Sequence, residues 1–234
     1  MTKIIAHRGA SRAERENTVA AFRRAALMRA DAVELDVRRS ADAGDDGLVV
    51  HHDPRVADGR VIFALRATEL PAHVPSLATA MDACGELVVN IEIKNEPGEP
   101  DYDDTRSVAD SVVELVRRRR QEGQVLVSSF DLETIDRIRV VAPELATAWL
   151  VEAADEGVLA TLAEHGHRVL HPWVGAVTAA LIDAAHEQGA VVNTWTCDDP
   201  HRMAELALWG IDGICTNVPD LALEVLRHLR HRPL

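Results

Sequence analysis

The chain has 234 residues, of which 47% are hydrophobic and 27% are charged, so it contains enough apolar material for a large core. Its formal net charge of −13 argues against a nucleic-acid partner, because binding a phosphate backbone requires a basic face. No apolar run is long enough to span a bilayer, no signal-peptide pattern opens the chain, and the three cysteines lack the spacing of a disulfide framework or a zinc site. We therefore expect a cytoplasmic protein without a stable membrane anchor.

Strand and helix patterns alternate along the chain, which is typical of a parallel sheet covered by helices. Apolar and β-branched runs predict strands over residues 3–7, 32–37, 48–51, 87–93, 124–128, 146–150, 168–171, 190–195 and 212–216. Helical periodicity predicts helices over residues 17–29, 76–84, 104–121, 131–141, 155–165, 178–188, 199–208 and 219–229. The expected helix N-caps include Asn17, Ser76, Asp131, Thr178 and Asp199.

Nine predicted strands are one more than an eightfold βα barrel needs. About ten turn-forming residues separate Val37 from Leu48, which is too short for the crossover that a parallel strand pair requires. Strands 32–37 and 48–51 should therefore form an antiparallel hairpin. We predict a single (β/α)8 TIM barrel domain over residues 1–234, with this hairpin projecting above its second strand and the polar segment 96–104 forming a loop over the site.

Polar clusters stand at strand ends, where barrel enzymes place their catalytic groups. These clusters are His7-Arg8-Gly9, Glu34-Leu35-Asp36, His52-Asp53 and Glu92-Ile93-Lys94. Alternation along a strand puts Glu34 and Asp36 on one face of their strand, and likewise Glu92 and Lys94 on one face of theirs. The apolar residues between them should pack on helices, which directs the carboxylates into the barrel mouth.

Three carboxylates converging in one place repel one another unless a cation lies between them. Hard oxygen ligands suit one divalent ion, Mg²⁺ or Ca²⁺, with Mn²⁺ as a further candidate. Glu34, Asp36, Glu92 and a phosphodiester together carry four negative charges, and a divalent ion with Arg8 and Lys94 carries four positive charges. The site balances only when both metal and phosphodiester are present, which predicts a metal-assisted phosphoryl reaction on a small molecule.

Cleavage of a phosphodiester also needs proton transfers at the attacking oxygen and at the leaving alkoxide, and histidine suits both near neutral pH. His7 ends the first strand, and His52 ends the return strand of the hairpin. The adjacent His51 should face the opposite way, and alternation alone does not choose between His51 and His52.

A series of motifs running in order from residue 4 to about residue 220 resembles the glycerophosphodiester phosphodiesterase family. The motifs are IIAHRGAS, ENTVAAFRRA, AVELDV, VVHHDP, VNIEIK, VLVSSFD, NTWTCDDP and GIDGICTNVPD. The resemblance implies a barrel fold with His7 and His52 as the acid/base pair. It also implies that the metal ligands are Glu34, Asp36 and Glu92. It selects His52 over His51, because the family's histidine immediately precedes the aspartate.

The resemblance also assigns binding roles. Arg8 and Lys94 match positions that contact phosphate, while Phe130 and Trp195 match pocket aromatics. The chain departs from the family pattern at Arg15, where a proline is usual, and in the extra hairpin residues ADAGDD. The family commonly inserts a small cap after the motif that matches His52-Asp53, whereas this chain continues directly toward helix 76–84, so we expect little or no cap.

Four further residues are candidates for supporting the site: Glu16, Asn17, Asp53 and His171. Asn17 is either an ordinary helix N-cap or a cap that also orients the site, and Glu16 is similarly ambiguous. His171 ends a strand just before Pro172, a position that suits the barrel rim.

The resulting hypothesis is metal-dependent hydrolysis of glycerophosphodiesters, such as glycerophosphocholine or glycerophosphoethanolamine, to glycerol 3-phosphate and an alcohol. One alternative is a phosphodiesterase of the lysophospholipase D type, and another is a non-catalytic phosphate-binding barrel. The sequence leaves open the preferred alcohol, the metal, the division of acid and base roles between the histidines, the oligomeric state, and whether water attacks directly or a cyclic phosphate forms first.

Overall fold

The parallel strands of the protein form a closed barrel. The computed structural model describes residues 1–230, and of residues 45 and 46 the backbone alone. Within the described residues, the nine strands are β1 (Lys3–Ala6), β2 (Ala32–Arg39), β3 (Leu48–Val50), β4 (Val88–Ile93), β5 (Val125–Ser129), β6 (Ala146–Val151), β7 (Val169–Pro172), β8 (Val191–Thr194) and β9 (Gly213–Thr216). The sheet runs in the order β1-β9-β8-β7-β6-β5-β4-β2-β3, and a parallel pairing of β1 with β2 closes it. The predicted barrel is confirmed.

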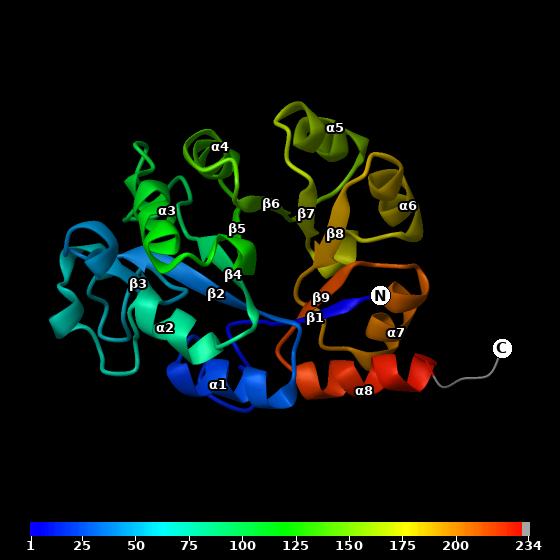
Figure 1. Cartoon of the computed structure of the whole chain (residues 1–234), viewed down its shortest axis with the longest axis horizontal. Coiled ribbons are helices and arrows are strands. Elements are labelled where there is room, and N and C mark those ends of the chain that lie inside the picture. The colour runs from blue at the N-terminus through cyan, green and yellow to red at the C-terminus, as the bar shows by residue number, and fades with distance from the viewer. Residues whose placement is uncertain (231–234) are drawn as a thin grey trace.

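Helices surround the strands in chain order, as Figure 1 shows. They are α1 (Val19–Met28), α2 (Leu77–Cys84), α3 (Ser107–Arg119), α4 (Leu132–Val141), α5 (Glu156–Glu164), α6 (Ala179–Glu187), α7 (Pro200–Leu208) and α8 (Pro219–Arg230). The hydroxyls of Ser76 and Thr178 and the carboxylate of Asp199 accept backbone N–H groups as the expected caps. Asp131 occupies its predicted cap position without a side-chain cap bond.

The prediction of Asn17 as a helix N-cap was wrong. Thr18 caps α1, because its hydroxyl accepts the N–H of Ala21 at 3.2 Å. Asn17 lies one residue earlier in a left-handed conformation, with φ of 56°, and is buried. Its side-chain amide does not cap α1 and is available for contacts in the site.

The short connection between the second and third predicted strands forms an antiparallel hairpin, as expected. β3 runs antiparallel to β2, with Val37 opposite Val50 and Arg39 opposite Leu48. The predicted end of the second strand at residue 37 was too early, since β2 continues to Arg39. Between β3 and α2 the described chain holds only the short 3₁₀ helices η2 (Ile62–Ala64) and η3 (Ala67–Glu69), which agrees with the expected lack of a cap insertion.

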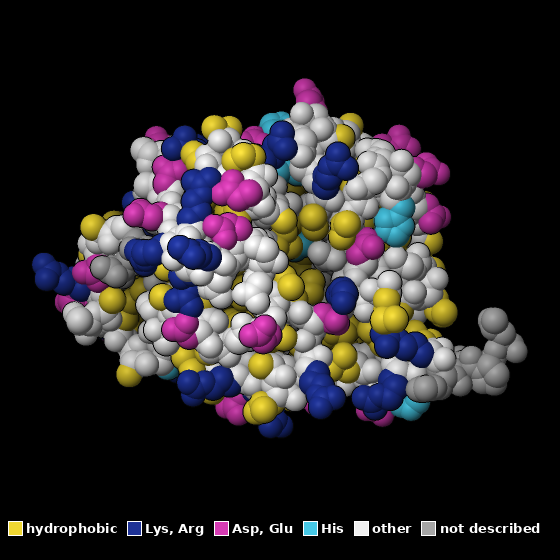
Figure 2. Space-filling model, viewed as in Figure 1, with side chains coloured by type: hydrophobic (Ala, Val, Ile, Leu, Met, Phe, Trp, Pro, Cys, Tyr) yellow, Lys and Arg dark blue, Asp and Glu magenta, His cyan; other side chains and the backbone are white. Residues whose placement is uncertain are grey.

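Strand alternation separates the two faces of the barrel wall. Val33, Leu35 and Val37 on β2 are fully buried in a cluster with residues of the surrounding helices. The residues between them point into the barrel, as expected. On the outer surface, acidic and basic side chains are interspersed over the face shown in Figure 2. Within residues 1–230, no helix combines the length and the apolar character that crossing a membrane would require.

Candidate active site

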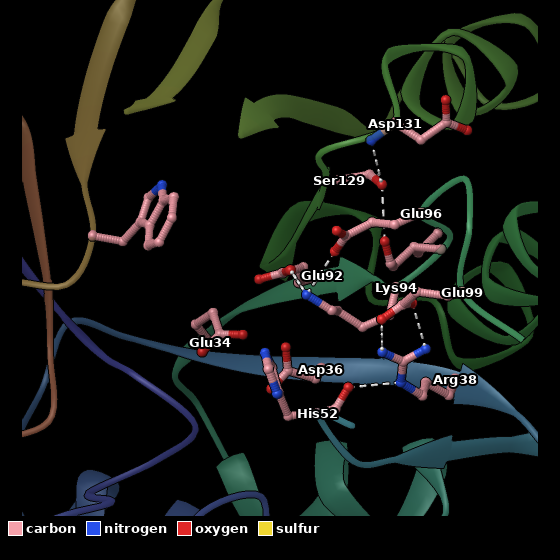
Figure 3. Close-up of polar contacts among 12 residues, drawn as sticks. Glu34, Asp36, Arg38, His52, Glu92, Lys94, Glu96, Glu99, Ser129 and Asp131 are labelled. Carbon is pink, nitrogen blue, oxygen red and sulfur yellow. Dashed lines mark hydrogen bonds and ion pairs between the residues drawn. The ribbon is translucent and has the colours of Figure 1, made fainter. Parts of the chain in front are cut away.

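Three carboxylates from two neighbouring strands meet at the mouth of the barrel. β2 carries Glu34 and Asp36, β4 carries Glu92, and the parallel register places Asp36 opposite Glu92. Each offers an oxygen that lies within 4.8 Å of those of the other two, and all three side chains are buried. Figure 3 shows them turned toward a shared space between the strands. The convergence expected from strand alternation is thus present.

The carboxylates perturb one another strongly. Burial, Asp36 and Glu92 raise the pKa of Glu34 well above its ordinary range. Burial also raises the pKa of Glu92 to about 7, against the opposing effect of Lys94. For Asp36, burial is the largest single effect and acts in the same direction, but the nearby cations, Arg8 first among them, and a hydrogen bond from Asn17 together outweigh it and lower the pKa. Without a cation, the cluster therefore favours a partly protonated state.

The donor set fits a divalent cation. One oxygen of Glu34 accepts the backbone N–H of Arg8 at 2.8 Å, while its other oxygen, Oε1, is buried without a hydrogen-bond partner. A buried carboxylate oxygen without a partner is costly, and a bound cation would supply the missing interaction. Glu34, Asp36 and Glu92 together form an oxygen-only site of the kind that Mg²⁺ and Ca²⁺ occupy.

Two cations flank the carboxylates. The Arg8 guanidinium contacts Asp36 Oδ2 at 3.2 Å through Nε and Glu16 at 3.1 Å through a terminal nitrogen. On the other side, Lys94 Nζ lies 2.8 Å from Glu92 Oε1 and 3.0 Å from Glu96 Oε1, as Figure 3 shows. Both cations also border the barrel cavity, where an anionic substrate would bind.

The loop after β1 is shaped to present Arg8. Arg8 has a positive φ of 55°, and Gly9 follows with a φ of 81°. A side chain at Gly9 would place its Cβ 2.6 Å from the carbonyl carbon of Ala21 in α1, so only glycine fits there. Asn17, at the end of the same loop, donates its Nδ2 to Asp36 Oδ2 at 2.7 Å. The sequence candidate Asn17 thus orients a carboxylate of the cluster.

A chain of polar groups orients His7. His7 Nδ1 lies 2.8 Å from Asn217 Oδ1, and the Asn217 Nδ2 donates to Asp198 Oδ2 at 2.7 Å. Because Asp198 accepts the amide nitrogen, the Asn217 oxygen must face His7, so Nδ1 carries the proton. His7 Nε2 then has a free lone pair, 3.9 Å from Glu34 Oε2. Burial, followed by the charge of Arg8, lowers the pKa of His7.

His52 and His51 separate as alternation predicts. His52 lines the same cavity as His7, and its Nδ1 lies 2.8 Å from the Asp53 carboxylate. His51 instead borders a neighbouring surface groove, with its Nδ1 2.8 Å from the Asp53 carbonyl oxygen. The candidate Asp53 therefore holds the ring of His52.

An uncharged wall completes the cavity. Phe130 and Trp195 meet edge to face with ring centroids 5.4 Å apart, and Trp195 Nε1 donates to the His171 carbonyl at 2.8 Å. His171 is buried, its Nε2 lies 3.1 Å from Asn193 Nδ2, and burial lowers its pKa to about 3. His171 thus contributes a neutral ring to this wall.

Sequence reasoning missed several residues of the site. Asn217 and Asp198 follow the last strands and reach His7 only through barrel closure, so no local pattern identifies them. Asn90 lines the cavity and could have been found, since it lies two residues before Glu92 on the same face of β4. Arg38 could have been found in the same way, two residues after Asp36 on β2.

Comparison with known proteins decides the family. The pattern of the glycerophosphoryl diester phosphodiesterase family matches residues 7–221. The chain belongs to this family. A glycerophosphodiester phosphodiesterase of Caldanaerobacter subterraneus subsp. tengcongensis is 28% identical, over 97% of this chain and 98% of the relative. The family and this relative identify the chain as an enzyme, a glycerophosphodiester phosphodiesterase.

Solved structures share the whole fold. A glycerophosphodiester phosphodiesterase from Thermotoga maritima superposes with a TM-score of 0.80 at 25% identity, covering 96% of this chain and 98% of its own. An Oleispira antarctica phosphodiesterase in complex with the product sn-glycerol-3-phosphate superposes with a TM-score of 0.88 at 22% identity, covering 97% of each chain. The phosphodiesterase barrel therefore extends along almost the entire chain.

Proposed function

We propose that this phosphodiesterase hydrolyses glycerophosphodiesters in a metal-dependent reaction, with His7 as base and His52 as acid. The observation that carries the proposal is the buried three-carboxylate cluster, flanked by two cations and bordered by the cavity that both histidines line. Glu34, Asp36 and Glu92 would hold one divalent ion, Mg²⁺ or Ca²⁺, which when bound polarises the phosphoryl group. Arg8 and Lys94 would share the charge that develops on the phosphoryl oxygens.

The hydrogen-bond partners of the histidines support this division of roles. Asn217 Oδ1 accepts a hydrogen bond from the Nδ1–H of His7, so His7 Nε2 is available to accept a proton from the nucleophile. That nucleophile is water or the neighbouring glycerol hydroxyl, and the same proton transfer serves both routes. The Asp53 carboxylate accepts from His52 Nδ1 and places a negative charge beside that ring, whereas the partner of His7 is a neutral amide. His52 would accordingly donate its Nε2 proton to the leaving alkoxide.

The proposed substrates are glycerophosphocholine and glycerophosphoethanolamine, with glycerol 3-phosphate and the alcohol as products. The product named in the Oleispira antarctica complex supports glycerol 3-phosphate as one of the two products. Phe130 and Trp195 would form the apolar wall against which the substrate packs.

An assay after metal removal tests the proposal. The protein is stripped with a chelator, resupplied with Mg²⁺, Ca²⁺ or Mn²⁺, and assayed on both substrates, on glycerophosphoglycerol and on lysophospholipids. We expect restored release of glycerol 3-phosphate from the glycerophosphodiesters. Cleavage of lysophospholipids alone would favour the lysophospholipase D alternative, and no restored activity on any substrate would favour a non-catalytic barrel.

A further inference from the structure

Arg38 is a fully buried cation outside the set of residues that would contact the substrate. It follows Glu34 and Asp36 on the same face of β2, and its side chain is 0% exposed. Figure 3 shows its guanidinium lying between the backbone of His52 and the segment that carries Glu99. A buried charge is costly unless it is paired, so its partners indicate what it holds in place.

Each nitrogen of the guanidinium has a partner. Nε donates to the His52 carbonyl oxygen at 2.7 Å. One terminal nitrogen donates to Glu99 Oε2 at 2.8 Å and to Asp101 Oδ2 at 2.9 Å, and the other donates to Glu99 Oε1 at 3.0 Å. Asp101 is itself buried, with a side chain only 2% exposed. This paired arrangement is one that a planar guanidinium can make and an ammonium cannot.

The three partners belong to segments that carry proposed catalytic groups. The His52 carbonyl is part of the peptide that joins His52 to Asp53, whose carboxylate holds the imidazole. Glu99 and Asp101 lie in the loop after β4, and the same loop carries Glu96, which contacts Lys94 Nζ at 3.0 Å. Arg38 therefore connects β2, the proposed acid and the loop beside the phosphate-binding lysine.

We propose that Arg38 is a positioning residue for proton donation to the leaving group. By binding the His52 carbonyl, Glu99 and Asp101 together, it holds the His52–Asp53 peptide at the distance from the three-carboxylate cluster that protonation of the alkoxide requires. The inference rests on the proposed acid role of His52. Misplacement of a catalytic group by about 1 Å costs on the order of 10²-fold in rate, so a residue that never touches substrate can have a large effect.

The test compares two leaving groups in the metal-loaded protein. The choline alkoxide that leaves glycerophosphocholine needs a proton, whereas the p-nitrophenyl ester of glycerol 3-phosphate releases p-nitrophenolate, which can leave without one. For Arg38→Lys, we expect kcat on glycerophosphocholine to fall on the order of 10²-fold with little change in KM. On the p-nitrophenyl substrate, kcat should fall less than about fivefold, and His52→Gln should show the same selective loss.

A matched control is available on the outside of the barrel. Arg137 also makes a paired contact with a carboxylate, Asp110, at 2.9 Å through two nitrogens, but on the exposed sides of α4 and α3. Arg137→Lys should leave both activities unchanged. Should Arg38→Lys fail to fold, Glu99→Gln keeps the guanidinium and its contacts with His52 and Asp101, and should give a smaller loss with the same selectivity.

The outcomes separate the inference from the function on which it rests. Equal losses on both substrates in Arg38→Lys, or in Glu99→Gln where the first variant does not fold, would overturn the positioning role. Unchanged activity on both substrates would overturn it as well. A wild-type protein that cleaves neither substrate with any metal would instead refute the proposed function.

Discussion

The two sides of the barrel cavity differ in charge, and in the proposed reaction this difference separates catalysis from substrate recognition. The side formed by β1, β2, β4 and the segment after β3 carries the ionisable groups, namely His7, Arg8, Glu34, Asp36, His52, Glu92 and Lys94. The opposite side, formed by β5 to β9 and the residues that follow them, offers uncharged groups, which include Phe130, Leu150, His171, Asn193, Trp195 and Cys215. In the proposed reaction, the charged side acts on the phosphodiester and the uncharged side shapes the space around it.

The groups on the charged side perturb one another and leave a polar atom without a partner, whereas the indole N–H on the uncharged side has its hydrogen-bond partner. Glu34 has a buried oxygen without a partner and a pKa raised well above its ordinary range by burial, Asp36 and Glu92. By contrast, the Trp195 indole N–H has a backbone acceptor, the His171 carbonyl. The charged side stores unfavourable energy that a cation and a substrate can relieve, so substitutions there should have larger effects.

The largest effect should come from Glu34→Gln, which removes a proposed ligand and a destabilising charge together. We expect kcat to fall by more than about 10³-fold, because the cluster loses one of its charged oxygen ligands. Because the folded-state pKa of Glu34 is raised, its ionised form opposes folding at neutral pH, and a neutral amide removes that cost. The melting temperature of the metal-free protein should therefore rise by roughly 2–4 °C for each kcal/mol relieved.

Scanning calorimetry with and without Mg²⁺ measures the change in melting temperature, and steady-state kinetics with Mg²⁺ measures the fall in kcat. Glu164→Gln is the control, since Glu164 is an exposed residue at the end of α5. A Glu34→Gln protein that keeps its activity would show that the carboxylate cluster is not the centre of the reaction.

The adjacent histidines offer the next sharpest contrast. His52→Ala should lower kcat on glycerophosphocholine by about 10²–10⁴-fold, because the leaving alkoxide loses its proton donor. His51→Ala, which alters a ring outside the cavity, should stay within about twofold of wild type. Steady-state kinetics on the two variants checks the assignment. Similar losses in both would mean that the whole segment, and not the His52 ring, is what the reaction needs.

Metal affinity should depend on pH with a definite sign. The pKa of Glu92 is raised to about 7 by burial and that of Glu34 is also raised well above its ordinary range, so protons occupy the cluster at low pH. A dication must displace these protons, and its affinity should rise between pH 6 and pH 8 by up to about tenfold per unit for each proton displaced. Titration calorimetry in buffers of different ionisation enthalpy counts the released protons. A pH-independent affinity would contradict binding at these carboxylates.

The smallest effect should lie on the uncharged side. Trp195→Leu removes the indole that packs on Phe130 and donates to the His171 carbonyl, yet leaves every ionisable group in place. We expect KM to rise by about 3–10-fold with kcat within about threefold of wild type, the pattern of a residue that binds ground state and transition state alike. A fall in kcat comparable with that of His52→Ala would remove the distinction between the two sides.

Much of the fold was predictable, and the errors were local. The eight parallel strands and the hairpin followed from alternating patterns and from one short connection, and both are confirmed. The helix cap at residue 17 was misassigned because Asn17 and Thr18 are both good capping residues, and only the left-handed backbone at Asn17 decides between them. The assignment of residues 1–234 to one domain stays a prediction.

The site divides in the same way between local and distant information. By itself, the sequence determined which side chains share a face, because alternation along a strand is a local property of the backbone: Glu34 with Asp36, and Glu92 with Lys94. Only the tertiary structure decided which groups orient the proton-transfer residues. Asn217 reaches His7 across 210 residues because β9 pairs with β1. Arg38 reaches the His52 carbonyl through the β2–β3 hairpin, and it reaches Asp101 because the loop after β4 folds back over β2. Such contacts depend on how the closed barrel brings distant segments together, and a local sequence pattern does not predict them.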